Sequence, residues 1–404
     1  MKRNLLVALT CALALAFLGC PPKTESTGTA SSTDTSAAGG EILIGEYGSL
    51  SGNQATFGQS THNAIMIAID EINAAGGVNG RKIRVQTEDD QSKAEEAANA
   101  VTKLISQNNV VAVLGEVASS NSLAAAPICQ SNKIPMISPS STNPDVTKKG
   151  DFIFRMCFLD DYQGGSMARY LHNKLGINKV AVLIDNKSDY STGLAKYFSD
   201  AFKALGGQIV VTQSFTSGDA DFRAQLTAIR TTNPQLIYIP AYYNDVGQIA
   251  IQARDLGMTM PLAGGDGWES PKLIEIGGKA LEGCFYSNHY FPGDSKPVVR
   301  DFVEKYKQRY SATPDALAAL AYDAAHVLAD SIKRAGSTDG TKLRDAIAAT
   351  KGYNGVTGEI NLGPDRNPVG KTLYINEVKN GQLALKAEVA PEPAAGAAPA
   401  TGTH

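Results

Sequence analysis

The sequence predicts an α/β fold made of two successive doubly wound units, each with a parallel sheet covered by helices on both faces. From residue 41 onward, short β-rich apolar runs alternate with longer segments of helical periodicity, and this alternation is typical of parallel sheets. The alternation restarts after residue 158. Removing the low-complexity ends leaves roughly 345 residues, which favours two domains over one.

The first unit is expected to contain four strands and three helices. The strands are EILIGEY (41–47), KIRVQTE (82–88), VVAVLG (110–115) and KIPMIS (133–138). The helices lie at about 60–75, from residue 92 onward, and at 122–130. In the first helix, apolar residues recur at helical spacing, as in Ala64, Ala68 and Ile72, so one face is expected to pack on the sheet.

The second unit repeats this order and is followed by helices whose location periodicity does not predict. Its strands are expected at 179–185, 208–215, 235–243, 261–267 and 282–290. Its helices are expected at 162–175, 190–205, 220–231 and 245–256. Three more helices (296–310, 314–335, 340–350) and two β runs (357–362, 371–377) complete the chain.

Both ends of the chain have the composition of targeting or flexible segments. Lys2 and Arg3 precede a short apolar stretch that ends at Cys20, a pattern that predicts a secretory signal over 1–20. AFLGC resembles a bacterial lipobox, which implies that Cys20 is lipidated. Residues 21–40 have the composition of a flexible tether, and residues 388–404 are expected to be disordered.

Composition and motifs exclude several classes of function. The formal net charge is −3 and no basic run is present, which argues against a nucleic-acid partner. The remaining cysteines, Cys129, Cys157 and Cys284, have wide spacing, which favours buried free thiols but leaves one disulfide open. The sequence lacks a nucleophile elbow, a phosphate-binding loop and metal-ligand spacing. We therefore expect no enzyme, cofactor or metal.

Hydroxyl side chains gather after two strands of the first unit, in GEVASSNS (115–122) and ISPSSTNP (137–144). Ligands of open parallel sheets bind at the carboxyl ends of the strands. A helix N-terminus there, with Ser119 or Ser120 and Thr142, could hold an anion. Serine and asparagine are also the usual caps of helices, so plain capping stays open as the alternative.

The ordered series AIDEINAAGGVNG, GEVASSNS, ISPSSTNP, DFIFR, YSTGLA and GGDGWES resembles the extracytoplasmic solute-binding proteins for branched-chain amino acids. These proteins are the receptors of bacterial ABC importers. The resemblance spans Ile42 to Glu377. It implies the type I periplasmic binding protein fold, in which two three-layer lobes are joined by three crossovers and close on a ligand. Lobe 1 would comprise 41–158 and 288–357, and lobe 2 would comprise 159–287 and 358–387.

The resemblance also implies a set of ligand-binding residues. Ser119 and Thr142 would bind the α-carboxylate, the main chain at Ser140 would help hold the α-amino group, and Asp266 would pair with the ammonium. Four further residues would line the site: Phe57, Val117, Ala118 and Tyr190. Tyr242 is preferred over Tyr243, since only one of two consecutive strand residues would face the cleft. The family has glutamate in place of Asp266 and a smaller residue in place of Ser140.

The sequence therefore predicts a monomeric, lipid-anchored receptor on the extracytoplasmic face of a bacterial membrane. It would capture a branched-chain or related small amino acid and deliver it to the permease subunits of an ABC transporter. A ligand sensor of the same fold, and a receptor for another small carboxylate or amide, are the alternatives.

Overall fold

The computed structural model describes residues 40–391. The signal, the tether up to residue 39, the expected lipidation site at Cys20 and residues 392–404 lie outside this range. Within residues 40–391, no helix is both long and apolar enough to cross a membrane.

Five parallel strands form the first sheet, in the order β2-β1-β3-β4-β5. The strands are β1 (Ile42–Gly48), β2 (Ile83–Asp89), β3 (Val113–Leu114), β4 (Met136–Ser138) and β5 (Ile153–Arg155). The helices between them are α1 (Ala55–Ala74), α2 (Ala94–Ser106), α3 (Ser119–Ser131) and the short η1 (Thr147–Lys149). Three helices that follow later in the chain also belong to this lobe: α9 (Pro297–Tyr310), α10 (Ala316–Ala335) and α11 (Gly340–Ala348).

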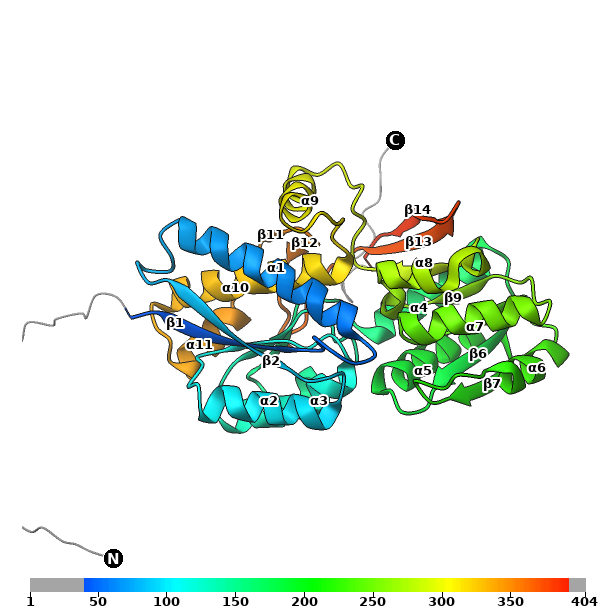
Figure 1. Ribbon diagram of the computed structural model, residues 1–404, viewed down its shortest axis with the longest axis horizontal. Coiled ribbons are helices and arrows are strands. Elements are labelled where there is room, and N and C mark those ends of the chain that lie inside the picture. The colour runs from blue at the N-terminus through cyan, green and yellow to red at the C-terminus, as the bar shows by residue number, and fades with distance from the viewer. Residues whose placement is uncertain (1–39, 392–404) are drawn as a thin grey trace, which may run out of the picture. The chain divides into compact units, whose positions relative to one another are not determined.

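The two faces of this sheet carry separate apolar clusters. Residues of α1, α9 and α10 pack on one face, and residues of α2 and α3 pack on the other. Figure 1 shows α1 and α10 running side by side above the sheet, with α2 and α3 below it. This is the three-layer lobe that the alternation of strands and helices predicts.

Seven strands form the second sheet, in the order β14-β13-β10-β9-β8-β6-β7. The strands are β6 (Lys179–Asp185), β7 (Gln208–Phe215), β8 (Leu236–Tyr238), β9 (Leu262–Gly264), β10 (Phe285–Asn288), β13 (Leu373–Lys379) and β14 (Gln382–Val389). The helices are α4 (Asp160–Arg169), η2 (Tyr170–Lys174), α5 (Asp189–Ala204), α6 (Arg223–Thr231), α7 (Tyr243–Asp255), η3 (Asp266–Trp268), α8 (Pro271–Gly277) and η4 (Gly278–Leu281). β13 and β14 are antiparallel to their neighbours, and the other strand pairs are parallel.

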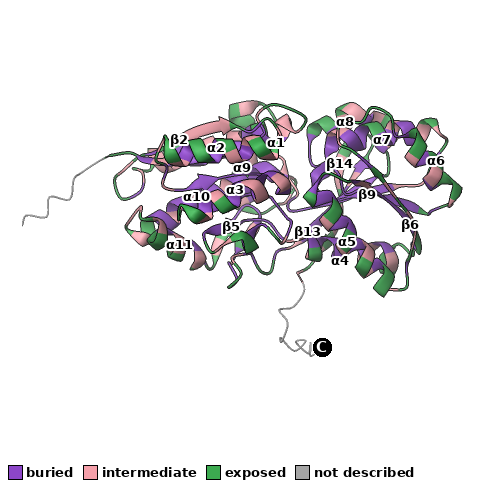
Figure 2. Ribbon diagram, turned by 90° about the horizontal axis from the view of Figure 1, so that it is seen from below, coloured by how far each residue is buried: buried purple, intermediate pink, exposed green. Residues whose placement is uncertain are grey.

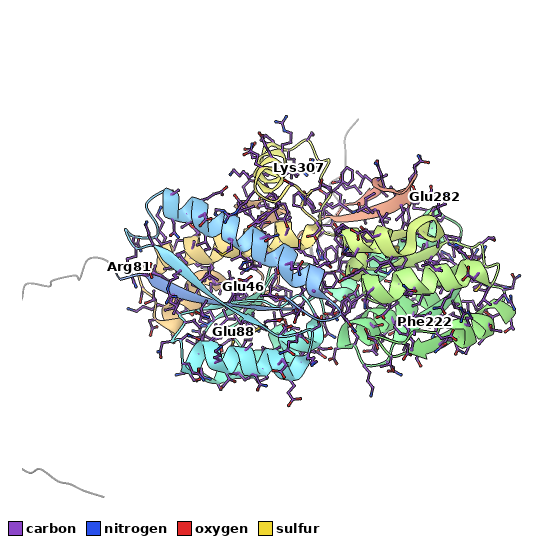
Figure 3. All side chains as sticks on the ribbon, viewed as in Figure 1. Glu46, Arg81, Glu88, Phe222, Glu282 and Lys307 are labelled. Carbon is purple, nitrogen blue, oxygen red and sulfur yellow. The ribbon has the colours of Figure 1, made fainter. Side chains whose placement is uncertain are left out.

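Buried residues concentrate along the strands and the inward faces of the helices in both lobes (Figure 2). In lobe 2, Phe222 at the start of α6 belongs to the large apolar cluster and lies among the side chains around β6 and β7 (Figure 3). In lobe 1, the buried carboxylate of Glu46 accepts a hydrogen bond of 2.7 Å from Thr87 and lies 2.8 Å from Nδ1 of His62.

The chain passes between the sheets three times, after β5, after β10 and before β13. The exact boundaries differ from those expected. β12 (Gly358–Ile360) pairs with β11 (Tyr353–Gly355), and Ile360 and Leu362 are buried in the lobe 1 cluster. Residues 358–362 therefore belong to lobe 1, because their apolar side chains are buried there. Asn288 pairs with Tyr374 in the second sheet and so belongs to lobe 2.

The C-terminal strand also extends further than expected. Residues 382–389 form β14, which pairs with β13 in a hairpin. The predicted disordered tail therefore cannot begin at residue 388. The alternating apolar residues Leu383, Leu385 and Ala387 lie in a strand whose backbone is paired on one side, and this pairing extends the ordered chain to Val389.

Candidate ligand-binding site

A small cavity lies between the two lobes, at the carboxyl ends of the strands. Its volume is about 10 Å³, room for about one water molecule and far below the range for small-molecule sites, which begins at about 300 Å³. The lobes are closed on each other here and would have to part to admit a ligand. Its lining residues are Phe57, Val117, Ser140, Thr142, Tyr190, Tyr242, Asp266, Gly267 and Leu317. Seven of the nine residues implied by the resemblance are therefore brought together here. Ser119 and Ala118 lie beside the cavity rather than in its lining.

The hydroxyl groups of the two serine-rich loops have two different roles. Ser138 Oγ donates to Glu116 O at 2.7 Å, and Ser122 Oγ lies 2.7 Å from Ser141 Oγ. These three serines tie the loops to each other. The Oγ of Ser140 and the Oγ1 of Thr142 are buried and line the cavity, and neither makes a hydrogen bond of ordinary geometry within the described residues. The Thr142 hydroxyl still interacts with the buried carboxyl of Asp160 and partly offsets the rise in its pKa. Buried polar groups normally have partners, so these two hydroxyls are suited to a ligand.

Helix α3 begins without a side-chain cap, so plain capping does not explain the serines of GEVASSNS. The N-cap is Ala118, and no side chain caps this helix. Ser119 is 1% exposed, and its Oγ accepts a long hydrogen bond of 3.3 Å from the amide of Asn143. Ser120 instead donates to Asp189 of lobe 2 at 2.7 Å. The two serines thus differ: Ser119 faces the neighbouring 140–143 loop, and Ser120 bridges the lobes.

An acidic side chain lies directly behind this helix end. Glu116 is 1% exposed and accepts a hydrogen bond from the amide of Ala118. Ser49 lies between the carboxyl groups of Glu116 and Asp90, at 3.1 and 2.9 Å. Burial, and then the nearby Asp90, raise the pKa of Glu116 well above its usual range. A neutral Glu116 does not repel an anion at the start of α3.

Aromatic rings form the wall of the cavity from both lobes. Tyr190 and Tyr242 of lobe 2 are stacked, with ring centroids 5.2 Å apart and planes at 9°. Phe57 of lobe 1 meets the edge of Tyr242 at 5.5 Å and of Tyr243 at 5.1 Å. As expected, Tyr242 lines the cavity and Tyr243 does not, but Tyr243 also reaches lobe 1, because β8 ends at Tyr238 and α7 begins at Tyr243. At a helix start, consecutive side chains do not point to opposite sides.

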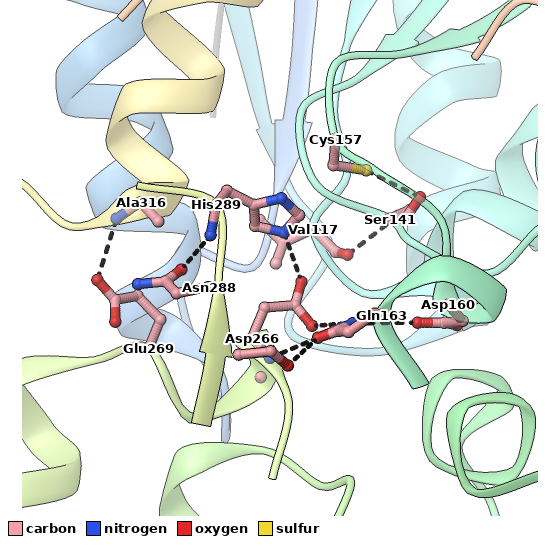
Figure 4. A network of polar contacts seen from close by, with 12 residues as sticks. Val117, Ser141, Cys157, Asp160, Gln163, Asp266, Glu269, Asn288, His289 and Ala316 are labelled. Atoms are coloured by element: carbon pink, nitrogen blue, oxygen red, sulfur yellow. Dashed lines mark hydrogen bonds and ion pairs between the residues drawn. The ribbon is translucent and has the colours of Figure 1, made fainter. Parts of the chain in front are cut away.

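Asp266 also lines the cavity and is held by three donors, of which Gln163 and His289 are labelled in Figure 4. Its Oδ1 accepts hydrogen bonds of 2.9 Å from Gln163 Nε2 and of 2.9 Å from Tyr190 OH. Its Oδ2 lies 2.9 Å from Nε2 of His289. Asp266 is 4% exposed. A buried carboxylate held this firmly is a strong partner for a cation that enters the cavity.

Glycines beside Asp266 allow Tyr190 to approach closely. A Cβ on Gly265 would lie 2.5 Å from Tyr190 OH, and one on Gly267 would lie 2.9 Å from the ring of Tyr242. The amide of Gly267 also donates to Tyr190 OH at 3.0 Å. The glycines of GGDG therefore serve side-chain packing at the site, and not a phosphate loop.

Several contacts join the lobes around the cavity. Tyr243 OH donates to the carbonyl of Asn53 at 3.2 Å, and the hydroxyls of Thr56 and Ser270 lie 2.9 Å apart. Together with the bond between Ser120 and Asp189, these contacts enclose the cavity. The lobes therefore surround a small buried space that is lined by hydroxyl groups and by one carboxylate.

The sequence pattern of the family described as "Periplasmic binding protein" matches residues 41–382. This chain belongs to the periplasmic binding protein family. The family consists of binding receptors and not of enzymes. Within the residues that the structure describes, no group of His, Cys, Asp and Glu side chains could hold a metal ion.

Curated relatives of this periplasmic binding protein carry names that refer to amino acids. It is 30% identical to the Leu/Ile/Val-binding protein homolog 3 of Brucella melitensis, over 75% of this chain and 82% of that protein. It is 31% identical to an amino acid binding protein of Pseudomonas aeruginosa, over 76% of this chain and 82% of that protein.

Solved structures of two bacterial proteins have the same fold. The leucine-binding protein LivK of Thermotoga maritima is 42% identical, with a TM-score of 0.83, over 87% of this chain and 99% of that chain. The branched-chain amino acid transporter substrate-binding protein LivJ of Streptococcus pneumoniae, solved with isoleucine, is 34% identical, with a TM-score of 0.82, over 88% and 100%. The two-lobed type I fold expected from the sequence is thus confirmed.

Three residues of the periplasmic binding protein's site were missed by sequence reasoning. Gln163 is fully buried and bonds to Asp266, His289 bonds to the same carboxylate, and Leu317 at the start of α10 lines the cavity. His289 directly follows a strand of lobe 2. The rule that ligands of parallel sheets bind at the carboxyl ends of the strands could therefore have pointed to it. Leu317 gave no signal, because helical periodicity does not say which lobe a helix joins.

Proposed function

We propose that this protein is an extracytoplasmic receptor that captures a branched-chain L-amino acid in the interlobe cavity and delivers it to an ABC permease. The carrying observation is that two hydroxyls without ordinary hydrogen-bond partners and one firmly held carboxylate line the same cavity. A zwitterion fits this arrangement, because each of its charges must be paired when it leaves water.

In the carboxylate half, the ligand would accept hydrogen bonds from Thr142 Oγ1 and Ser119 Oγ, next to the uncapped start of α3. The free amide groups and partial positive charge of a helix N-terminus favour an anion. Ser140 lies beside them with a second unpartnered hydroxyl, and its main chain would help hold the amine. The neutral Glu116 leaves the helix end free of competing charge.

In the amine half, the ammonium would bind Asp266, and the aliphatic side chain would pack against Phe57, Val117, Tyr242 and Leu317. Charge-assisted hydrogen bonds contribute about 1.5–3 kcal/mol each, and burial of a leucine-sized side chain contributes about 1.5–3 kcal/mol. These contributions are sufficient for a micromolar dissociation constant, about −8 kcal/mol. The names of the relatives support the same ligand class.

Calorimetry of the protein after unfolding and refolding, which removes carried ligand, tests this proposal. We expect leucine, isoleucine or valine to bind with a dissociation constant of about 10 μM or tighter. Failure of every free amino acid to bind below millimolar concentration would disprove the proposed ligand class. Tight binding of a carboxylate without an amine would favour the alternative receptor for another small carboxylate.

Removal of the Thr142 hydroxyl should weaken ligand binding strongly. Thr142→Val keeps the shape of the side chain and is expected to raise the dissociation constant about 10- to 100-fold, since it removes a hydrogen bond to a charged group. Ser119→Ala should act in the same direction. Ser131→Ala, at the exposed far end of α3, is the matched control, because Ser131 Oγ donates to the carbonyl of Ile128 in its own helix. An unchanged affinity of Thr142→Val would contradict the carboxylate assignment.

The anchoring of the protein forms a separate part of the proposal. A lipid on Cys20 would hold a monomeric receptor at the membrane surface, with residues 21–40 as the tether. Incorporation of labelled palmitate that is lost in Cys20→Ala would support this part. Labelling of the variant at the wild-type level would oppose it.

A sensor of the same fold would bind the same ligand but would not deliver it. Uptake of labelled leucine by cells that lack this protein separates the two functions. We expect uptake to fall, because the receptor supplies the permease. Unchanged uptake together with a lost transcriptional response would instead favour the sensor.

A further inference from the structure

His289 contacts Asp266 but is not among the residues that line the cavity. It follows β10, in the second crossover between the lobes, and is 2% exposed. Its Nε2 lies 2.9 Å from Asp266 Oδ2. Because a carboxylate can only accept a hydrogen bond, Nε2 carries the proton and donates it.

The imidazole ring is fixed in place by the first crossover. It stacks on Phe158 with ring centroids 3.7 Å apart and planes at 27° (Figure 4 shows His289 and its bond to Asp266). Its other nitrogen, Nδ1, is buried and has no hydrogen-bond partner within the described residues. The bond to Asp266 is therefore the polar contact that orients this side chain.

The donors around Asp266 leave little room for a further partner. A carboxylate offers about four acceptor positions, and Gln163, Tyr190 and His289 occupy three of them. One position, on Oδ2, remains for the ammonium of a ligand. His289 and that ammonium would therefore share one oxygen.

The charge state of His289 matters for this reason. A protonated ring would place a positive charge 2.9 Å from the oxygen that the ammonium needs. Burial lowers the pKa of His289 below its usual value, Asp266 partly offsets this effect, and Lys371 lowers the pKa further. The ring is therefore neutral at pH 7.

We infer that His289 is a positioning residue that directs the Asp266 carboxylate toward the amine of the ligand and weakens amino-acid binding when it gains a proton in acid. The inference rests on the proposed function, since it concerns the amine half of the same site. It assigns the receptor an affinity that falls as the surroundings become acidic.

Two substitutions test separately the contributions of the hydrogen bond and of the aromatic ring of His289. His289→Phe keeps an aromatic ring against Phe158 but removes the donor, and His289→Gln places an amide Nε2 near the position of the lost ring nitrogen. At pH 7.5 we expect His289→Phe to bind leucine at least about tenfold more weakly, while His289→Gln stays within about threefold of wild type. His172→Gln, on η2 of lobe 2, is the matched control and should bind as wild type does.

The dependence of leucine affinity on pH tests the effect of a charge on His289. As the pH falls from 7.5 to 5, wild type should lose affinity relative to His289→Gln, because only wild type can gain this proton. The loss should appear toward the acid end, because the pKa of His289 is lowered. Near His289, burial raises the pKa of Asp160 to about 8 and of Cys157 to about 12, and lowers that of Lys371 to about 8, so these groups keep one charge state over most of this range.

Burial also raises the pKa of Asp90 and Asp315 to about 6 and of Glu269 to about 7. Asp90, Asp315 and Glu269 titrate in both wild type and His289→Gln. The difference between the two profiles of affinity against pH therefore reports on His289.

The outcomes distinguish this inference from the proposed function. If wild type binds no amino acid, the proposed function fails. If wild type binds leucine and His289→Phe, folded as judged by circular dichroism, binds equally well, the inference fails alone. If His289→Phe does not fold, the comparison of wild type with His289→Gln decides, and parallel pH profiles would overturn the inference.

Discussion

Asp266→Asn is expected to weaken leucine binding by at least about 100-fold at pH 7.5, because it removes the charge that pairs with the ammonium. Loss of one partner of a buried charge pair costs about 2–5 kcal/mol, since the other charge stays buried and unpaired. The asparagine amide would also face the donors of Gln163, Tyr190 and His289, which now bond to a carboxylate. Calorimetry with leucine measures the effect.

The controls for Asp266→Asn use both the protein and the ligand. Asp266→Glu keeps the charge and is expected to bind leucine at least about tenfold more tightly than Asp266→Asn does. The analogue 4-methylpentanoate lacks the amine, so its binding should differ by less than about threefold between wild type and Asp266→Asn. Leucine affinity within about fivefold of wild type in Asp266→Asn would place the ammonium elsewhere.

The layered architecture could be predicted from the sequence because each element carries its own periodic signal. Alternating apolar strands and amphipathic helices indicate doubly wound lobes wherever the pattern is regular. The boundaries were less predictable. Residues 358–360 form a hairpin with 353–355 in lobe 1, and this outcome depends on where Ile360 is buried. Long-range burial of this kind leaves no local trace in a sequence.

The candidate site could be predicted only in part, from the rule that ligands of open parallel sheets bind at the carboxyl ends of the strands. That rule brought GEVASSNS, ISPSSTNP and GGDGWES together, and the resemblance to a family gave the residues their roles. Sequence could not tell which hydroxyls serve the ligand. In the structure, Ser122, Ser138 and Ser141 hold the loops together, while Ser140 and Thr142 face the cavity. The two groups have the same chemistry and differ only in the direction of their side chains.

Arg155→Met is expected to lower both the stability of lobe 1 and the affinity for ligand. Arg155 is fully buried at the end of β5, and its guanidinium donates to the carbonyls of Ser141 and Asn143. These carbonyls flank Thr142 in the ligand-binding loop. Methionine fills much of the space but removes a donor from each carbonyl, at about 1–3 kcal/mol each, and leaves Ser141 O with only the weak donor Cys157 Sγ at 3.4 Å. We expect the free energy of unfolding to fall by about 2–5 kcal/mol.

Urea denaturation and calorimetry on the same variants separate the two effects of Arg155. Arg155→Lys keeps the charge but lacks the planar fork that reaches two carbonyls at once, so its loss of stability should be smaller than that of Arg155→Met. In both variants leucine affinity should fall, because the loop that carries Thr142 loses hydrogen bonds from the Arg155 guanidinium. If Arg155→Met unfolds at the wild-type urea concentration with an unchanged slope, the guanidinium does not hold this loop. A stable variant with weakened binding would instead mean that Arg155 acts on the position of Thr142 and contributes little to folding.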